Sequence, residues 1–196
     1  MTAVACVGIA VLDIVFSVDE LPSAAGKYYA REYREIGGGV AANAAATVTA
    51  LGGHARYVGR VGDDAVGQRI LAELRDWDVD TTHVEQVAGC GSSVSAVLVD
   101  RTGERLIVNH VDPRLFGNGA RLDGGALAGM DAVLVDTRWP DGAEAALSAT
   151  AARGAPAVLD CDRAPASEGD RLLKAASHVV FSETALTELA GVDVLD

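Results

Sequence analysis

The chain has 196 residues, of which 49% are hydrophobic and 22% charged, so it can bury a core and does not have the composition of a disordered protein. With 16 basic and 28 acidic residues its formal net charge is −12, which argues against nucleic acid or an anionic membrane as a partner. A small anionic substrate is not excluded, because it needs only a few local cations.

The cysteines and the hydropathy pattern suggest an intracellular setting. Cys6, Cys90 and Cys161 are too few and too widely spaced for a disulfide framework or a CxxC zinc site. The sequence contains neither a basic segment followed by a short apolar stretch nor a run of 18 apolar residues. We therefore expect a cytoplasmic protein without a membrane partner.

The first elements are predicted to be strands. Residues 3–10 form a short apolar run typical of a buried central strand. Asp13 follows at the strand end, where α/β sheets place ligand-binding groups, although a turn aspartate is the alternative. Residues 14–18 are strand-like, and residues 27–36 alternate bulky and polar side chains as in a half-exposed strand, which carries Lys27.

A glycine turn comes next and opens a helix. Gly37, Gly38 and Gly39 let the backbone turn sharply and approach a ligand, because no Cβ stands in the way. Residues 41–51 are rich in alanine and are predicted to be helical, so bare N–H groups at the helix start point toward the ligand. Asn43 lies in the first turn and can both donate and accept hydrogen bonds; a capping role is the alternative.

Another buried strand is predicted at residues 54–61, followed by a helix that ends at Trp77. Asp63 or Asp64 is placed to cap this helix, since a carboxylate suits the positive helix N-terminus. Ligand contact is the alternative role for this acidic pair.

Two alternating runs, residues 92–100 and 105–111, surround a glycine-containing turn and predict a β-hairpin with Asn109 near its end. A lone hairpin is only marginally stable, so it must add to another strand layer. Residues 27–36 are the expected partner, and together they predict a small secondary sheet that stands off the main domain as a lid.

The last third alternates strands and helices, which predicts a parallel sheet covered on both faces. Arg138 follows the first of these strands, at the ligand edge of the sheet, where it either binds a ligand or lies on the surface. The expected strands are residues 132–136, 157–160 and 178–181, and the expected helices are residues 141–153, 167–176 and 183–190.

Three motifs together resemble the ribokinase (pfkB-type) family of carbohydrate kinases. The first is the glycine turn with its helix, Gly37-Gly38-Gly39-Val40-Ala41-Ala42-Asn43-Ala44-Ala45 through Gly52. The others are Val7-Gly8 with Asp13, and Gly59-Arg60-Val61-Gly62-Asp63-Asp64 with Gly67. The resemblance covers essentially the whole chain.

The resemblance implies an α/β fold in three layers, with a parallel sheet between helices and a small protruding β-sheet lid. Residues 1–196 would form one such domain without its C-terminal part, with lid segments at about 14–36 and 91–112. The resemblance also implies ATP-dependent phosphorylation of a sugar hydroxyl with Mg²⁺, and a homodimer joined through the lids. Residues matching Asp13 and Asn43 would hydrogen-bond sugar hydroxyls, and Gly38 and Gly39 would lie against the sugar.

Several further details resemble the sulfofructose kinases within this family. These are Ala5-Cys6-Val7-Gly8-Ile9, Leu21-Pro22 with Gly26-Lys27-Tyr28, Ile107-Val108-Asn109, Asp136-Thr137-Arg138-Trp139-Pro140-Asp141-Gly142 and Phe181-Ser182-Glu183. The implied substrate is 6-deoxy-6-sulfofructose, converted to its 1-phosphate. Lys27, Asn109 and Arg138 would hold the anionic end of the sugar, with Arg as a planar fork and Lys as a point charge.

The chain also departs from the family. The second family signature, Asp-Thr-x-Gly-Ala-Gly-Asp, is absent, so we expect the catalytic base and the turn that stabilises the transferring phosphoryl group to lie beyond Asp196. The 196 residues would then carry the sugar-binding half and be inactive alone. Many relatives have Asn-x-x-Glu to organise Mg²⁺; here Ser182 and Ala185 replace both, with Glu183 as a substitute.

Alternatives remain open at this level. Another sugar kinase, of the fructokinase or 2-keto-3-deoxygluconate kinase type, or a nucleoside kinase, would share the fold and differ in the pocket. A catalytically inactive sugar-binding remnant is a further alternative. A dinucleotide-binding oxidoreductase is disfavoured, because no G-x-G-x-x-G follows the first strand.

Overall fold

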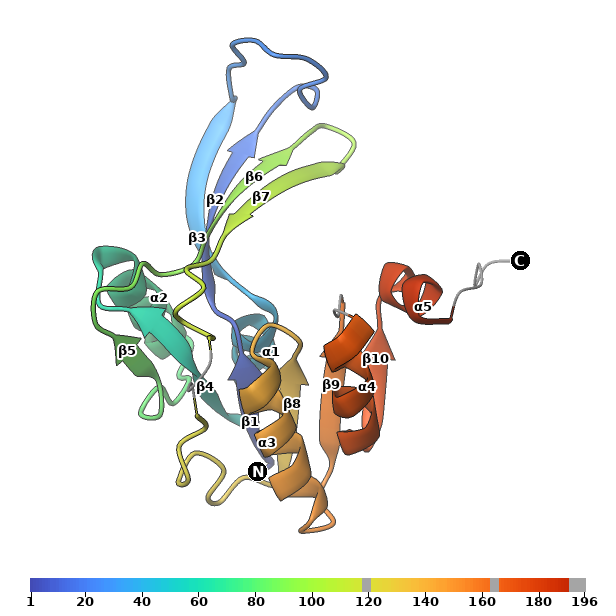
Figure 1. The fold of residues 1–196 in the computed structure, drawn as a ribbon. Coiled ribbons are helices and arrows are strands. Elements are labelled where there is room, and N and C mark those ends of the chain that lie inside the picture. Colours follow the sequence, from blue (N-terminus) through green and yellow to red (C-terminus); the bar gives the residue numbers. More distant parts are fainter. Residues whose placement is uncertain (118–120, 163–165, 191–196) are drawn as a thin grey trace.

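The computed structural model describes residues 1–117, 121–162 and 166–190. Its main element is a six-stranded sheet in which every neighbouring pair of strands is parallel, in the order β10-β9-β8-β1-β4-β5 (Figure 1). The strands are β1 (Ala3–Gly8), β4 (His54–Gly62), β5 (Glu85–Val87), β8 (Ala132–Asp136), β9 (Ala157–Cys161) and β10 (His178–Phe181).

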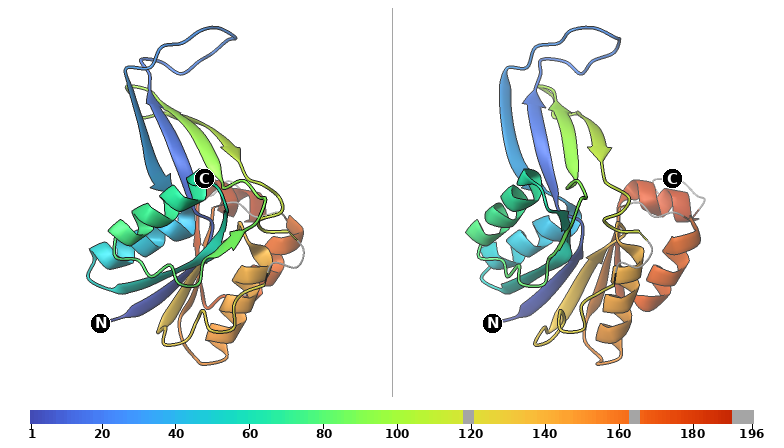
Figure 2. Two further views of the ribbon diagram at one scale, coloured as in Figure 1. Left: turned by 90° about the vertical axis from the view of Figure 1, so that its left-hand side faces the viewer. Right: turned by 60° about the vertical axis from the view of Figure 1, so that its left-hand side comes forward.

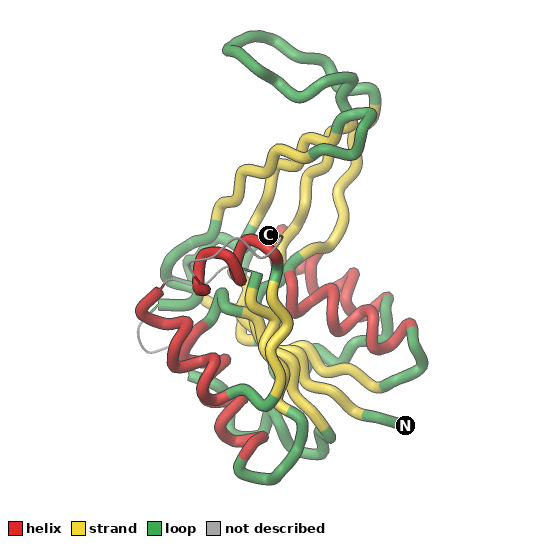
Figure 3. Tube along the Cα trace, turned by 90° about the vertical axis from the view of Figure 1, so that its right-hand side faces the viewer, coloured by secondary structure: helices red, strands yellow, loops and turns green. Residues whose placement is uncertain are grey.

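Helices cover both faces of this sheet, and Figure 3 shows the sheet between two helical layers. Successive side chains of β1 point to opposite faces of the sheet and pack against both helical layers. Ala5 and Val7 pack in the cluster on the α3 side, whereas Cys6 packs with residues of α1 and α2. The predicted three-layer α/β architecture is therefore confirmed. The helices are α1 (Val40–Ala50), α2 (Ala65–Asp76), α3 (Pro140–Ala151), α4 (Ala166–Ala175) and α5 (Glu183–Ala190).

A second, four-stranded sheet stands off the main sheet as the predicted lid (Figures 1 and 2). Its strand order is β3-β2-β6-β7, with β2 and β6 parallel and the outer pairs antiparallel. The strands are β2 (Val11–Ser17), β3 (Glu32–Gly38), β6 (Val94–Val99) and β7 (Arg105–His110).

Three details of the lid differ from the sequence prediction. The hairpin β6–β7 pairs with β2 and not with the segment at residues 27–36. Strand β3 begins at Glu32, so Lys27 lies in the connection between β2 and β3. Asp13 lies within the lid strand β2, because the chain passes from β1 into β2 after only two residues and without a crossover helix.

All the predicted helices are present, with ends that differ from the predicted ones by no more than two residues. Helix α1 follows the glycine turn, and Asp64 caps α2 by accepting from the Gly67 N–H at 2.8 Å. In the part of the chain that the structure describes, no helix combines the length and the apolar character needed to cross a membrane.

Candidate functional site

A cavity of about 490 Å³ lies between the lid and the carboxyl edge of the main sheet. We call it the lid cleft. Ligands of open α/β sheets bind at this edge, because the strand-end loops converge there. The polar and charged residues that line it come from the lid sheet, from α1 and from the loops after β8 and β9: Asp13, Asn43, Ser95, Arg105, Asn109, Arg138 and Asp162.

Three of these side chains form a row across the lid. Asp13 of β2 is paired with Ser95 of β6, which is in turn paired with Asn109 of β7. Residues paired in this way lie on the same face of a sheet, so the row presents a carboxylate, a hydroxyl and an amide to the cleft. Burial raises the pKa of Asp13, and a hydrogen bond with Ser95 acts in the opposite direction. The row can both donate to and accept from sugar hydroxyls.

The glycine turn borders the same cleft. Gly39 has a φ of 97°, and a Cβ there would lie 2.5 Å from the Ile9 carbonyl oxygen. A Cβ on Gly38 would lie 2.2 Å from a carboxylate oxygen of Asp13. Only glycine therefore allows β3 and α1 to approach β2 this closely. Asn43, one turn into α1, lines the cleft beside Gly39.

The cations of the cleft come from two sides. Arg138 follows β8 and its guanidinium pairs with Asp162. Arg105 of β7 makes no hydrogen bond or ion pair with any residue that the structure describes. The sequence prediction did not include Arg105, Ser95 or Asp162. The alternation of β7 is a signal that could have revealed Arg105, since it shares a face with Asn109 four residues later.

The structure brings together most of the predicted site residues. Asp13, Gly39, Asn43, Asn109 and Arg138 all line the lid cleft, and Gly38 packs against Asp13. The exception is Lys27, which lies in the connection between β2 and β3 and is absent from the cleft lining. Its Nζ lies 5.8 Å from the ring centroid of Tyr29.

The predicted magnesium residue, Glu183, is exposed at the first position of α5. Among the side chains that the structure describes, in residues 1–117, 121–162 and 170–189, no group of three or more His, Cys, Asp or Glu could hold a metal ion. Ser182 has a capping role here, because its Oγ accepts from the Ala185 N–H at 3.0 Å. The described residues do not by themselves fit a Mg²⁺ site, so we derive no step through the metal.

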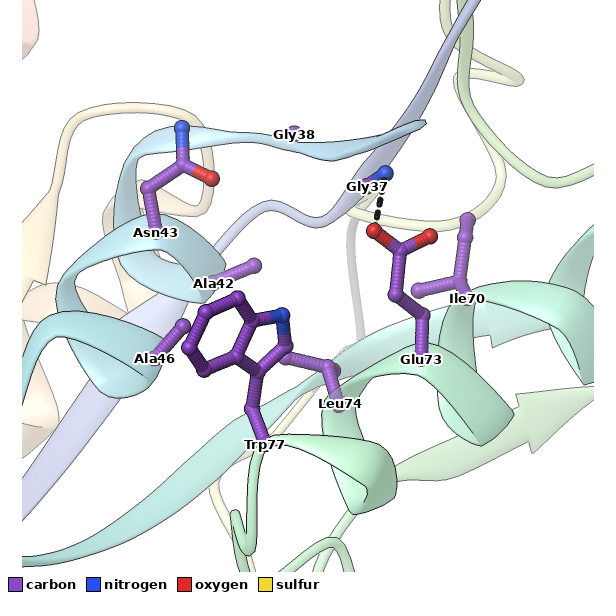
Figure 4. A pocket seen from close by; sticks show the side chains of 9 residues that line it. All are labelled: Gly37, Gly38, Ala42, Asn43, Ala46, Ile70, Glu73, Leu74 and Trp77. Carbon is purple, nitrogen blue, oxygen red and sulfur yellow. Dashed lines mark hydrogen bonds between the residues drawn. The ribbon is translucent and has the colours of Figure 1, made fainter. Parts of the chain in front are cut away.

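A much smaller pocket lies on the other side of the glycine turn, between α1 and α2 (Figure 4). Glu73 of α2 accepts from the Gly37 N–H at 2.7 Å there, and Trp77 closes one side. Its volume of about 40 Å³ is close to that of a single water molecule and too small for a sugar. Glu73 therefore supports the turn from behind, and the lid cleft remains the candidate site.

Residues 1–194 match the profile of the pfkB family carbohydrate kinases. The chain belongs to this family. One similar protein is the ATP-dependent ribose-1-phosphate kinase of Halopiger xanaduensis, 29% identical over 170 residues, which are 87% of this chain and 57% of the relative. The ribokinase of Haemophilus influenzae is 26% identical over 188 residues, covering 94% of this chain and 61% of the relative.

Solved structures of the family agree with the fold. A crystal structure from Agrobacterium tumefaciens, provisionally described as a ribokinase, superposes with a TM-score of 0.94 at 42% identity, covering 99% of this chain and 63% of that one. Arabidopsis thaliana ribokinase, in complex with ribose and ATP, has a TM-score of 0.80 at 23% identity, covering 97% of this chain and 62% of that one. The ribokinase-like fold is thus confirmed, and the chain spans about three-fifths of the length of these relatives.

Proposed function

We propose that this protein is an ATP-dependent carbohydrate kinase that binds its sugar in the lid cleft and transfers a phosphoryl group to one of the sugar hydroxyls. The observation that carries the proposal is the convergence of Asp13, Asn43 and Asn109 on one cavity beside a glycine turn. Carboxylate and amide groups bind polyols through paired donor and acceptor contacts. The glycines allow the ring to approach the backbone.

Each side chain has a distinct role in this proposal. Asp13 accepts hydrogen bonds from sugar hydroxyls, and its contact with Ser95 orients the carboxylate. Asn43 offers a donor and an acceptor from the first turn of α1, and Asn109 does so from the lid. Because these groups come from the lid and from α1 of the main domain, a bound sugar would hold the lid and the main domain in one relative position. ATP supplies the phosphoryl group, and none of the described residues is assigned to the nucleotide.

The finer proposal is an anionic sugar, 6-deoxy-6-sulfofructose, phosphorylated at its 1-hydroxyl. Arg105 and Arg138 are two guanidinium groups on one cavity, and Arg suits an oxyanion with its planar fork. Arg105 has no partner among the described residues, so an anion can bind it without displacing a carboxylate. At Arg138 the ligand must compete with Asp162.

A phosphorylated sugar is the second candidate, since it would use the same two cations. One relative, 29% identical, is named an ATP-dependent ribose-1-phosphate kinase, and that name describes a sugar that already carries a phosphate. A neutral hexose, as in the fructokinase alternative, would leave both guanidinium groups without a ligand.

Steady-state phosphorylation tests these proposals. The protein is assayed with ATP and 6-deoxy-6-sulfofructose, fructose, fructose 6-phosphate, ribose 1-phosphate or 2-keto-3-deoxygluconate. We expect Arg138→Ala and Arg105→Ala each to lower the kcat/KM ratio of sulfofructose over fructose by about tenfold or more, because each removes a charge-assisted contact. Lys27→Ala tests the predicted third cation. Arg153→Ala, at an exposed site after α3, is the matched control.

The assay separates the candidates. Turnover of every sugar with an unchanged ratio in both arginine variants would contradict the anionic proposal and leave the kinase proposal standing. No turnover and no binding of any of these sugars would contradict both. Faster turnover of a phosphorylated sugar than of sulfofructose would favour the second candidate.

We also propose that two copies of the protein associate through their lids. The support is the exposure of apolar side chains on the lid edge, where Ile107 is 49% and Val108 62% exposed. These two neighbours in β7 point to opposite faces of the lid, so the edge strand exposes an apolar side chain on each face.

A further inference from the structure

Asp136 is a fully buried carboxylate at the end of β8, and two of the residues that it contacts, Ile9 and Arg138, line the lid cleft. It accepts three backbone hydrogen bonds. Its Oδ2 accepts from the Ile9 N–H at 2.8 Å and from the Ala41 N–H at 3.2 Å, and its Oδ1 accepts from the Arg138 N–H at 2.9 Å. It makes no ion pair with any residue that the structure describes.

The three N–H groups belong to segments that carry three of the cleft residues, Asp13, Asn43 and Arg138. Ile9 lies in the two-residue connection from β1 to β2, the strand of Asp13. Ala41 lies in the first turn of α1, two residues before Asn43. The third N–H is that of Arg138 itself. One side chain therefore connects three backbone segments that are far apart in the sequence.

The local structure is built around this carboxylate. Gly39, the residue before α1, has no side chain to cap the helix, so Asp136 supplies the missing acceptor from another strand. A Cβ on Gly8 would lie 2.2 Å from the carboxyl group, so only glycine leaves room for it. A buried carboxylate without an ion pair is unfavourable by itself, which is why its hydrogen bonds matter.

We infer that Asp136 is the positioning residue of the lid cleft. Its carboxylate fixes the start of β2, the first turn of α1 and the loop of Arg138 relative to one another, and it does not itself touch the sugar. The expected effect on sugar affinity rests on the proposed function. The positioning itself rests on the three backbone hydrogen bonds.

Asp136→Asn tests the inference, because the side chain keeps its size but loses one of its two acceptor oxygens. Asp131→Asn is the matched control, since Asp131 accepts from the Ala3 N–H at 2.8 Å at the far end of the same strand pair. Two quantities are measured: the dissociation constant of 6-deoxy-6-sulfofructose, and the NMR signal of the Asn43 side-chain amide. We expect Asp136→Asn to raise the dissociation constant at least tenfold and to shift the Asn43 signal, and Asp131→Asn to change neither.

A folded Asp136→Asn protein with the wild-type dissociation constant and an unmoved Asn43 signal would overturn the inference. If the wild-type protein binds none of the sugars in the panel, the proposed function fails, and the Asn43 signal alone then decides whether Asp136 positions the cleft.

If Asp136→Asn does not fold, a pH titration of the wild-type protein replaces it. Burial raises the pKa of Asp136 to about 6, and the charge of Arg138 acts on this pKa in the opposite direction. The titratable neighbours Cys6 and Tyr57 keep their protons far above that pH.

The carboxylates that face the cleft, Asp13 and Asp162, accept from none of the three N–H groups. We expect the amide signals of Ile9, Ala41 and Arg138 and the Asn43 side chain to shift together, with one midpoint near pH 6. Separate midpoints, or a fixed Asn43 signal, would overturn the inference.

Discussion

Asp13 within β2 and Asp136 at the end of β8 have different roles in this site. Asp13 faces the lid cleft and is partly buried, so its carboxylate is available to a ligand. Asp136 faces the backbone and is fully buried, so its carboxylate is saturated by protein N–H groups. We expect Asp13 to determine sugar affinity by direct contact, and Asp136 to determine it by positioning the neighbouring residues.

Asp13→Asn is expected to weaken sugar binding by about tenfold to a hundredfold, because one charge-assisted hydrogen bond contributes about 1.5–3 kcal/mol. The variant keeps the shape of the side chain, so its thermal unfolding should stay close to that of the wild type. The measurement is the KM for the sugar, or its dissociation constant. Asp19→Asn is the control, since Asp19 lies on the same lid but pairs with Arg31 and Arg101 away from the cleft. An equal loss in both variants would contradict a specific role for Asp13.

Asp136 should leave a signature in the pH dependence of stability. Its pKa is raised from 3.8 to about 6 in the folded protein, so between these values the native state binds more protons than the unfolded state. This group therefore makes the free energy of unfolding fall as the pH rises from about 4 to 7, by roughly 3 kcal/mol at most.

Asp136→Asn lacks this contribution. The stability difference between the wild type and Asp136→Asn should shrink as the pH rises through that window, measured by urea unfolding. A difference that is constant with pH would contradict the raised pKa.

At the scale of elements, the close packing of the site depends on the glycine turn between β3 and α1. Gly39→Ala would place a methyl group 2.5 Å from the Ile9 carbonyl oxygen in a backbone conformation with φ of 97°. Gly52→Ala is the matched control, because Gly52 has a φ of 82° and nothing within 4 Å of the added methyl. Gly52→Ala should lower the free energy of unfolding by about 1–2 kcal/mol, and Gly39→Ala by clearly more. Calorimetry or urea unfolding measures both, and equal losses would contradict the clash.

Local patterns predicted most of the elements, and long-range pairing accounts for what they missed. Apolar runs and strand–helix alternation predicted β1, β4 and the last three strands, because burial on both faces leaves a simple composition signal. The pairing of β6 with β2 depends on contacts between segments about 80 residues apart, which no local pattern encodes. Residues 27–36 alternate throughout, yet only the part from Glu32 onward finds a partner strand.

The site was predictable to a similar degree. Asp13, Asn43, Asn109 and Arg138 were found because each follows a recognisable strand end, helix start or family motif. The role of Asp136 was not predicted, because it depends on three N–H groups that only the folded chain brings together. Lys27 was predicted from a motif, and the structure places it outside the cleft lining.

At the scale of the molecule, the lid is narrow and its outer strand β7 is exposed along its whole length. We expect the protein to sediment as a dimer at micromolar concentrations, because an apolar edge of this kind is stabilised by association. The double variant Ile107→Glu/Val108→Glu places charges on both faces of the edge and should sediment as a monomer. Arg153→Glu, on the main domain, should remain dimeric. A wild-type protein that is monomeric at these concentrations would contradict the lid-mediated dimer.

The measurement that tests the central claim most directly is a calorimetric titration of the protein with 6-deoxy-6-sulfofructose, with fructose in parallel, for the wild type and Asp13→Asn. The account predicts that the wild type binds the sulfonated sugar more tightly than fructose and that Asp13→Asn weakens both. If the wild type bound neither sugar, 6-deoxy-6-sulfofructose would not be the substrate, and if Asp13→Asn bound both sugars as tightly as the wild type, the lid cleft would not be the sugar site.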